Sequence, residues 1–429
     1  MTIRIDRRGV LAGAAAFGSL GALGIPAARA QDARIRLLWW GSQNRNERTA
    51  AVIDLFTGAN PGVAVEGESA GWDAYWARLA TQTAGGNAPD VMQMDYRYIF
   101  EYARRGVLLA LDDAMADGAL DLSGFSQEAI AGGQVDGKTY GVSLGANSST
   151  MIVSQAAFEE AGVALPEKGI TWDDFAARAA ELTEKAGKRG FYGSADAGGL
   201  EPTFEGWLRQ RGKALYDAES KLGFDAEDAT AWFAMWQAMR ESGACVPADL
   251  QALDQLNIET SMVSLGHAGV SFAHSNQIVG YQGMSQTPLV MVPYPIGGPD
   301  SKPGQYLKPS MFFSLSANSG VPAEAAGFVS FFVNDPAATE VLGVERGVPE
   351  SAPVRESLKA SLDALGQAQI DYIESLGDLA GPLPPPPPAG AGEIQFALKR
   401  INEEVGFGTP PEAGAEALIS EATAILERG

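Results

Sequence analysis

The side chains that could carry out chemistry are few, and their spacing excludes several common catalytic sites. The chain has two histidines, His267 and His274, and a single cysteine, Cys245. One cysteine forms neither an intramolecular disulfide nor a cysteine-based zinc site. The sequence contains no phosphate-binding P-loop, no His-Glu-x-x-His zinc motif and no Gly-x-Ser-x-Gly nucleophile motif. We therefore expect no metal and no cofactor, and catalysis that rests on several histidines is excluded.

Carboxylates are the remaining groups with catalytic potential. Adjacent acids occur at 112–113, 159–160 and 173–174. Neighbouring residues point to different sides of a helix or strand, so this spacing does not make a catalytic pair. A pair assembled from distant loops, as glycosidases use, stays an alternative.

The net charge of the chain excludes some classes of binding partner. Asp and Glu number 53 against 31 Lys and Arg, which gives a formal net charge of −22. Such a chain is repelled by phosphate backbones and by anionic lipids, and we expect no nucleic acid partner. The 429 residues, 46% of them hydrophobic, predict a globular protein of two or three domains.

The elements that position the chemistry alternate at the start of the chain. Apolar spacing predicts strands at 34–40, 63–67 and 90–94 and helices at 48–59 and 72–83. This order favours a parallel sheet with helices on both faces. Ligands bind beyond the carboxyl ends of such strands, so the loops 41–44 and 95–97 are candidate site loops.

The rest of the chain is mostly helical. Helices are predicted at 156–161, 172–186, 204–211, 229–242 and 323–333, and from Glu393 and Glu412. Strands are predicted at 150–153, 268–272, 289–292 and 311–315. Residues 382–388 are proline-rich and typical of polyproline II; we expect a stiff surface connector, with a binding role as the alternative.

The N-terminus has the three parts of a secretory signal. Basic residues precede an apolar run over 9–25, and small residues lead to a predicted cleavage after Ala30. The pair Arg7-Arg8 makes this segment, 1–30, resemble a twin-arginine signal. An N-terminal membrane anchor is the alternative. No later stretch is long enough to span a membrane, so we expect export to the periplasm.

Four stretches resemble one protein family when taken in order. Residues 72–95 combine a helix, a Gly-rich turn and a Pro-Asp-Val strand, and 106–113 fit the pattern Gly-x-Leu-x-x-Leu-Asp. Residues 135–162 and 266–281 look like two segments that cross between domains. Together they resemble the extracellular solute-binding proteins of ABC importers, in the sugar-binding family of the maltose-binding-protein type.

The resemblance implies an α/β fold of the two-lobed periplasmic-binding-protein type. Three crossing segments, near 144–147, 272–275 and 313–316, would join the lobes around a ligand cleft that closes like a hinge. The implied division assigns 31–143 and about 276–312 to lobe 1. Lobe 2 would then hold 144–275 and about 313–429.

A sugar needs planar polar groups at its hydroxyl edge and rings against its C–H face. Phe272 stands where the family often has a stacking tryptophan. On this chemistry and the resemblance, the expected ligand-binding residues are Trp40, Gly41, Ser42 and Gln43 after the first strand, Asp95, Tyr96 and Arg97 after the third, Asn147 and Ser148 at the first crossing, Trp207, Phe272 and His274 in the second lobe, and Lys308 and Arg346 in late loops.

Three of these residues bear on ligand charge. If two or more of Arg97, Lys308 and Arg346 face the cleft, an anionic sugar such as a uronate is expected, because charged hydrogen bonds are the stronger kind. If they face solvent, a neutral sugar is expected.

The function implied by the resemblance is binding without catalysis. A monomeric periplasmic protein would capture a mono- or oligosaccharide, or a sugar derivative, and deliver it to the transmembrane permease subunits of an ABC importer. Two alternatives stay open: a secreted carbohydrate-active enzyme, and a binding protein for a non-sugar solute such as an opine or a polyamine.

Overall fold

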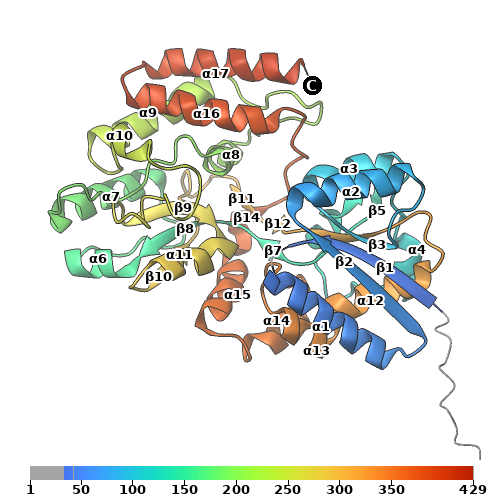
Figure 1. Cartoon of the computed structure of the whole chain (residues 1–429). Coiled ribbons are helices and arrows are strands. Elements are labelled where there is room, and N and C mark those ends of the chain that lie inside the picture. The colour runs from blue at the N-terminus through green and yellow to red at the C-terminus, as the bar shows by residue number, and fades with distance from the viewer. Residues whose placement is uncertain (1–32, 42, 429) are drawn as a thin grey trace, which may run out of the picture.

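The computed structural model describes residues 33–41 and 43–428, which form two α/β lobes (Figure 1). The predicted signal, 1–30, and Ser42 lie outside the described residues. Among the helices of the described ranges, none has the length and apolar character needed to cross a membrane.

Lobe 1 is built on a mixed sheet with the strand order β2-β1-β3-β13-β6. The three N-terminal strands are parallel, and β13 runs antiparallel to both of its neighbours. The strands are β1 Ala33–Trp40, β2 Val63–Ala70, β3 Val91–Met94, β6 Val142–Ser143 and β13 Phe312–Leu315, with a small hairpin of β4 Gln134–Val135 and β5 Lys138–Thr139. The helices are α1 Gln43–Ala59, α2 Trp72–Ala84, α3 Tyr96–Arg104, α4 Asp112–Ala116, α5 Gln127–Ala131, α12 Pro322–Asn334 and α13 Pro336–Leu342.

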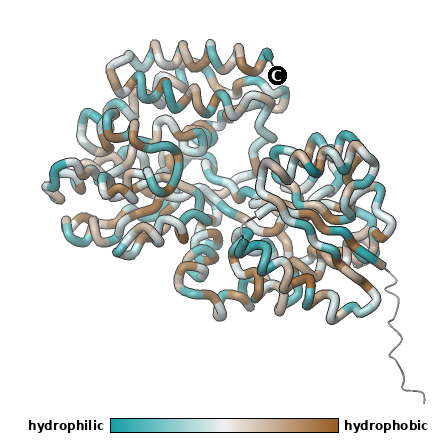
Figure 2. The backbone as a smooth tube through the Cα atoms, viewed as in Figure 1, coloured by the Kyte–Doolittle hydropathy of each residue, from teal (hydrophilic) through white to brown (hydrophobic). Residues whose placement is uncertain are grey.

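The sequence of β1 explains its place inside this sheet, between β2 and β3. Arg34 and Arg36 alternate with the buried Ile35 and Leu37, and every residue from there to the end of the strand is buried. A strand that is covered on both faces needs such an apolar run. Figure 2 shows hydrophobic residues along the strands and many hydrophilic residues on the outward turns of the helices.

Lobe 2 contains an antiparallel sheet with the order β10-β8-β9. The strands are β8 Ser149–Ser154, β9 Val270–His274 and β10 Leu289–Val292. The helices are α6 Gln155–Ala161, α7 Trp172–Ala186, α8 Glu201–Gln210, α9 Ala226–Glu241, α10 Ala248–Gln251, η1 Ser275–Gln277, α11 Ile278–Met284, α16 Ala391–Gly406 and α17 Pro411–Leu426. Trp232 and Trp236 are four residues apart on α9, and both side chains are fully buried.

Three segments cross between the lobes side by side. The first contains β7 Ala146–Asn147, which pairs with the second, β12 Lys308–Pro309. The third follows α13, and its Val348 exchanges two backbone hydrogen bonds with Ala146. The helices α14 Ala352–Lys359 and α15 Ala364–Leu376, which the sequence did not predict, lie between the lobes beside these crossings (Figure 1).

The predicted division between the lobes is wrong for the elements from α11 to α13, between residues 276 and 342. Residues 276–312 were assigned to lobe 1, yet α11 and β10 belong to lobe 2, where β10 pairs with β8. The following residues to 342 were assigned to lobe 2, yet β13, α12 and α13 complete the sheet and core of lobe 1. The second and third crossings therefore lie near 308–310 and 343–350 rather than at 272–275 and 313–316.

The crossing segments approach each other closely at two glycines. A Cβ on Gly145 would lie 2.7 Å from the carbonyl oxygen of Arg346. Gly347 has a φ of +100°, in the region that L side chains rarely adopt, and a Cβ there would lie 3.0 Å from the carbonyl oxygen of Ala146. Both contacts are to backbone, which has little room to shift.

We predict that Gly145→Ala destabilises the protein by about 1–3 kcal/mol, because the new methyl group overpacks the crossing. Gly320→Ala is the matched control, since no atom lies within 4 Å of a Cβ at that position. Urea unfolding followed by tryptophan fluorescence measures both variants. Equal stability of the two variants would contradict the close packing at Gly145.

Candidate ligand-binding site

A cavity of about 110 Å³ lies between the lobes. Lobe 1 contributes the start of α3, and lobe 2 contributes the start of α8 and the end of β9. The remaining walls come from residues next to the second crossing and from the proline-rich segment. The polar residues of the lining are Asp95, Tyr96, Arg97, Glu201, Glu205, Tyr216, His274, Tyr306 and Lys308.

The lobe 1 wall is set by the helix cap of α3. Asp95 follows β3, and its carboxylate accepts a hydrogen bond of 2.9 Å from the backbone N–H of Arg97. This cap fixes the position at which the helix begins. Tyr96 is consequently turned inward and nearly buried, whereas the Arg97 side chain is exposed at the cavity.

The lobe 2 wall presents two carboxylates. Glu201 and Glu205 are four residues apart on α8, so they share one face of the helix. Burial and, to a smaller extent, the neighbouring Glu205 together raise the pKa of Glu201 to about 7, against the opposing charges of Lys308 and Arg97. Burial also raises the pKa of Glu205, against a hydrogen bond of 2.8 Å that the Tyr306 hydroxyl donates to its Oε2. At neutral pH, Glu201 is therefore in equilibrium between its neutral and charged forms.

His274 is held neutral at the end of β9. Burial lowers its pKa to about 4, with the charge of Lys308 acting in the same direction. Its Nδ1 is buried and has no hydrogen-bond partner among the described residues. A neutral imidazole at this point offers a ligand a hydrogen-bond donor or acceptor without a charge.

The predicted residues of the first crossing support the site from behind. Asn147 pairs with Lys308 across the two crossing strands. Ser148 is buried, and its hydroxyl donates a 2.8 Å hydrogen bond to the backbone carbonyl of Tyr306. Both residues thus position the cavity residues next to them in the second crossing, but neither lines the cavity itself.

The aromatic residues predicted to stack on a ligand are instead packed in the cores. Trp207 is 2% exposed, with the Arg211 guanidinium 3.6 Å above its ring. Phe272 stacks on Trp172 at 6.3 Å and borders a separate hollow of about 170 Å³ that shares His274 with the cavity. Trp40 is buried against Trp72, Tyr75 and Trp76. Their burial in core packing accounts for their absence from the cavity wall.

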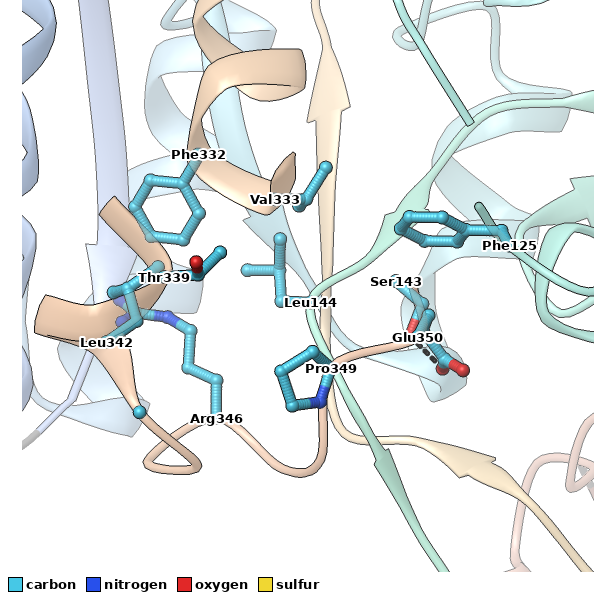
Figure 3. A pocket seen from close by; sticks show the side chains of 11 residues that line it. Phe125, Ser143, Leu144, Phe332, Val333, Thr339, Leu342, Arg346, Pro349 and Glu350 are labelled. Carbon is cyan, nitrogen blue, oxygen red and sulfur yellow. Dashed lines mark hydrogen bonds between the residues drawn. The ribbon is translucent and has the colours of Figure 1, made fainter. Parts of the chain in front are cut away.

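Three further predicted residues lie outside the cavity lining. Gly41 and Gln43 follow β1, and the Gln43 amide donates to Glu47 on its own helix. Arg346 is 3% exposed inside lobe 1, where Figure 3 shows its side chain beside Thr339 and Leu342. Its Nη2 donates to the Thr49 hydroxyl at 2.8 Å, so this cation holds the third crossing to lobe 1 and does not face the cleft.

Five of the predicted residues meet at the cavity, and the sequence did not identify several of their neighbours. The five are Asp95, Tyr96, Arg97, His274 and Lys308. Glu201 was missed because the helix was predicted to begin at 204, whereas α8 begins at Glu201. Glu205 lay inside the predicted helix but was not connected with Glu201. Their four-residue spacing was the available signal. Within the described ranges, no three His, Cys, Asp or Glu side chains gather closely enough to hold a metal ion.

Comparison with known proteins identifies the fold and the family. The family model for bacterial extracellular solute-binding proteins matches residues 51–364. An extracellular solute-binding protein of family 1 from Alicyclobacillus acidocaldarius has a similar structure, with 30% identity, a TM-score of 0.82 and coverage of 92% of this chain and 98% of its own. A periplasmic oligogalacturonide-binding protein from Yersinia enterocolitica shares the fold, with 23% identity, a TM-score of 0.77 and coverage of 92% and 99%.

Curated sequences give a more local match. A binding protein from Brucella abortus is 28% identical over 143 residues, which are 33% of this chain and 34% of that protein. The match thus spans about a third of the length of the curated relative. Members of this family bind solutes, which agrees with the prediction of binding without catalysis. Because the family model covers most of the chain and a structural relative is similar over nearly all of it, the protein belongs to the bacterial extracellular solute-binding proteins, family 1.

Proposed function

We propose that this protein is the periplasmic substrate-binding component of an ABC importer and that it captures a carbohydrate between its lobes. The main observation behind this proposal is the lining of the cavity. Charged planar groups from α3 and α8 line it together with the rings of Tyr96, Tyr216 and Tyr306. Such groups suit the hydroxyl edge and the C–H face of a sugar. Closure of the lobes would bring the two walls onto the ligand for delivery to the permease.

The cations at the cavity favour a sugar acid as the ligand. Arg97 and Lys308 both line it, and neither forms a salt bridge with any residue that the structure describes. A carboxylate on the ligand would accept charge-assisted hydrogen bonds from these two side chains. The oligogalacturonide-binding protein from Yersinia, which shares this fold, is named for a sugar acid of this kind.

The paired carboxylates also raise the possibility of glycoside hydrolysis, because a general acid needs a raised pKa of the kind that Glu201 has. Glu201 and Glu205 lie on the same wall, however, whereas a glycosidase places its two carboxylates on either side of the bond it cleaves. We therefore propose that they accept hydrogen bonds from sugar hydroxyls, and that the purified protein releases no product from oligosaccharides.

We predict that sugar acids raise the melting temperature of residues 31–429. A ligand at about 100 times its dissociation constant adds about 2.7 kcal/mol to the stability. The measurement is a thermal melt against galacturonic and digalacturonic acid, maltotriose and sulfonated sugars, with spermidine and an opine as non-sugar solutes. A rise in the melting temperature with maltotriose alone would support the carbohydrate function and contradict the proposal that the ligand is anionic. A shift with spermidine or the opine alone would contradict the carbohydrate function.

We predict that Arg97→Gln and Lys308→Gln each weaken binding of digalacturonic acid by about tenfold or more, since a hydrogen bond to a charged group contributes about 1.5–3 kcal/mol. Arg105→Gln is the control, because Arg105 is an exposed arginine at the opposite end of α3, where it pairs with Glu101 and does not line the cavity. Isothermal titration calorimetry measures all three variants. Equal dissociation constants for the Arg97, Lys308 and Arg105 variants would exclude the two cations from the site.

We predict that Glu201 makes stability depend on pH. Its pKa is raised in the folded protein, so its contribution to stability is complete below the unfolded pKa and is lost as the pH rises through about 7. Glu201→Gln copies the neutral form and should gain stability over the parent above about pH 7, with the gain shrinking as the pH falls. Urea unfolding across this range tests the sign. A constant difference between the two proteins would show that Glu201 does not titrate there.

A further inference from the structure

The proline-rich segment takes a path that the sequence did not predict. Residues 382–388 were expected to form a surface connector, and they include five consecutive prolines. They join β14 Ala380–Gly381 to α16, and Figure 1 shows this connection running through the space between the two lobes. The segment borders the candidate cavity through Leu383, Pro384, Pro385 and Pro387.

Lobe 2 and its crossing hold the beginning of the segment. β14 pairs in parallel with β11 Gln305–Tyr306, which precedes the second crossing. Next along the chain, the carbonyl of Pro382 accepts a 2.6 Å hydrogen bond from Nη2 of Arg209 on α8. The same guanidinium lies 5.1 Å from the centre of the Tyr306 ring, so it connects the segment to the cavity wall.

Lobe 1 holds the segment from the other side. The Tyr96 hydroxyl donates a 2.8 Å hydrogen bond to the carbonyl of Pro384. The neighbouring Leu383 packs against the lobe 1 core. Tyr96 is itself 9% exposed and follows the capped start of α3, so its ring has a fixed position. The segment is thereby attached to both lobes at adjacent residues.

The chemistry of proline suits a rigid apolar wall. A proline has no backbone N–H and a fixed φ, and consecutive prolines form a stiff polyproline II helix. Their rings present C–H groups, and the carbonyls stay free to accept hydrogen bonds, as Pro382 and Pro384 show. Because Trp40, Trp207 and Phe272 are packed away in the lobes, the proline rings are a major apolar surface of the cavity.

We propose that Leu383, Pro384, Pro385 and Pro387 form the apolar wall of the binding cavity, on which the C–H face of a sugar ring packs, and that Tyr96 ties this wall to lobe 1. The identity of the ligand rests on the proposed function. The position of the wall rests on the contacts to Tyr96 and Arg209 alone.

Binding tests the wall with variants of matched composition. Pro385 and Pro387 line the cavity, while Pro386 and Pro388 do not. We expect the double variant P385A/P387A to weaken binding by about tenfold, and P386A/P388A by less than about twofold, because only the first pair loses ring contacts. Calorimetry with digalacturonic acid and with maltotriose measures both variants, after thermal melts have shown that each is folded.

The tie to lobe 1 is tested without any ligand. In a Cys245→Ala background, spin labels are attached to cysteines replacing Arg105 on α3 and Ala389 after the prolines, both of which are exposed. Tyr96→Phe removes the hydroxyl and should broaden the distance distribution between the labels. Tyr98→Phe, on the same helix, is the control and should leave it unchanged.

The outcomes separate this proposal from the proposed function. If the parent protein binds a sugar and the two proline pairs behave alike, the wall is wrong and the function stands. If the parent protein binds neither of these sugars nor any other sugar of the melting panel, the carbohydrate function is wrong, and the sugar-packing role of the wall is wrong with it. An unchanged distance distribution in Tyr96→Phe would overturn the tie in either case.

Discussion

The position of the two lobes relative to each other depends on three short backbone segments that pair where they cross between the lobes. β7 pairs with β12, and Val348 bonds to Ala146, so all three crossings run together. Two glycines make this approach close enough, since a Cβ at Gly145 or Gly347 would meet backbone. The three covalent connections between the lobes are therefore gathered in one place. The cavity lies next to the bundle, where Lys308 and Asn147 face each other in register.

Acidic and basic side chains both line the cavity, and they act on each other. Arg97 and Lys308 lower the pKa of Glu201, while burial and Glu205 raise it by more. The protonation of Glu201 therefore responds to any charge that enters the cavity. An anionic ligand would favour the neutral carboxyl, and a cationic ligand would favour the carboxylate. The site thus adapts its own charge to its occupant near neutral pH.

Local patterns in the sequence predicted much of the fold. The range predicted for α7, 172–186, matches the structure, and Asp95 was placed at the end of the third strand, where it caps α3. The partners of late strands were not predictable in this way. β10 and β13 carry similar apolar runs, but they belong to different sheets, and the apolar pattern of a strand does not specify its neighbour. The predicted ligand contacts of Trp207 and Phe272 were wrong for a related reason, because an aromatic side chain suits a sugar face and a protein core equally well.

The order of the chain has a consequence for folding. The sheet of lobe 1 lacks β13, the strand between β3 and β6, until the chain has been synthesised to residue 315. Lobe 2 lacks the cover of α16 and α17, which pack with α9 over Trp232 and Trp236, until residue 426 is available. Neither lobe is a contiguous folding unit, and contacts between distant residues slow the search for the native state. A chain synthesised to before residue 312 would thus expose two unfinished cores at once, and the C-terminal helix pair then completes the core of lobe 2.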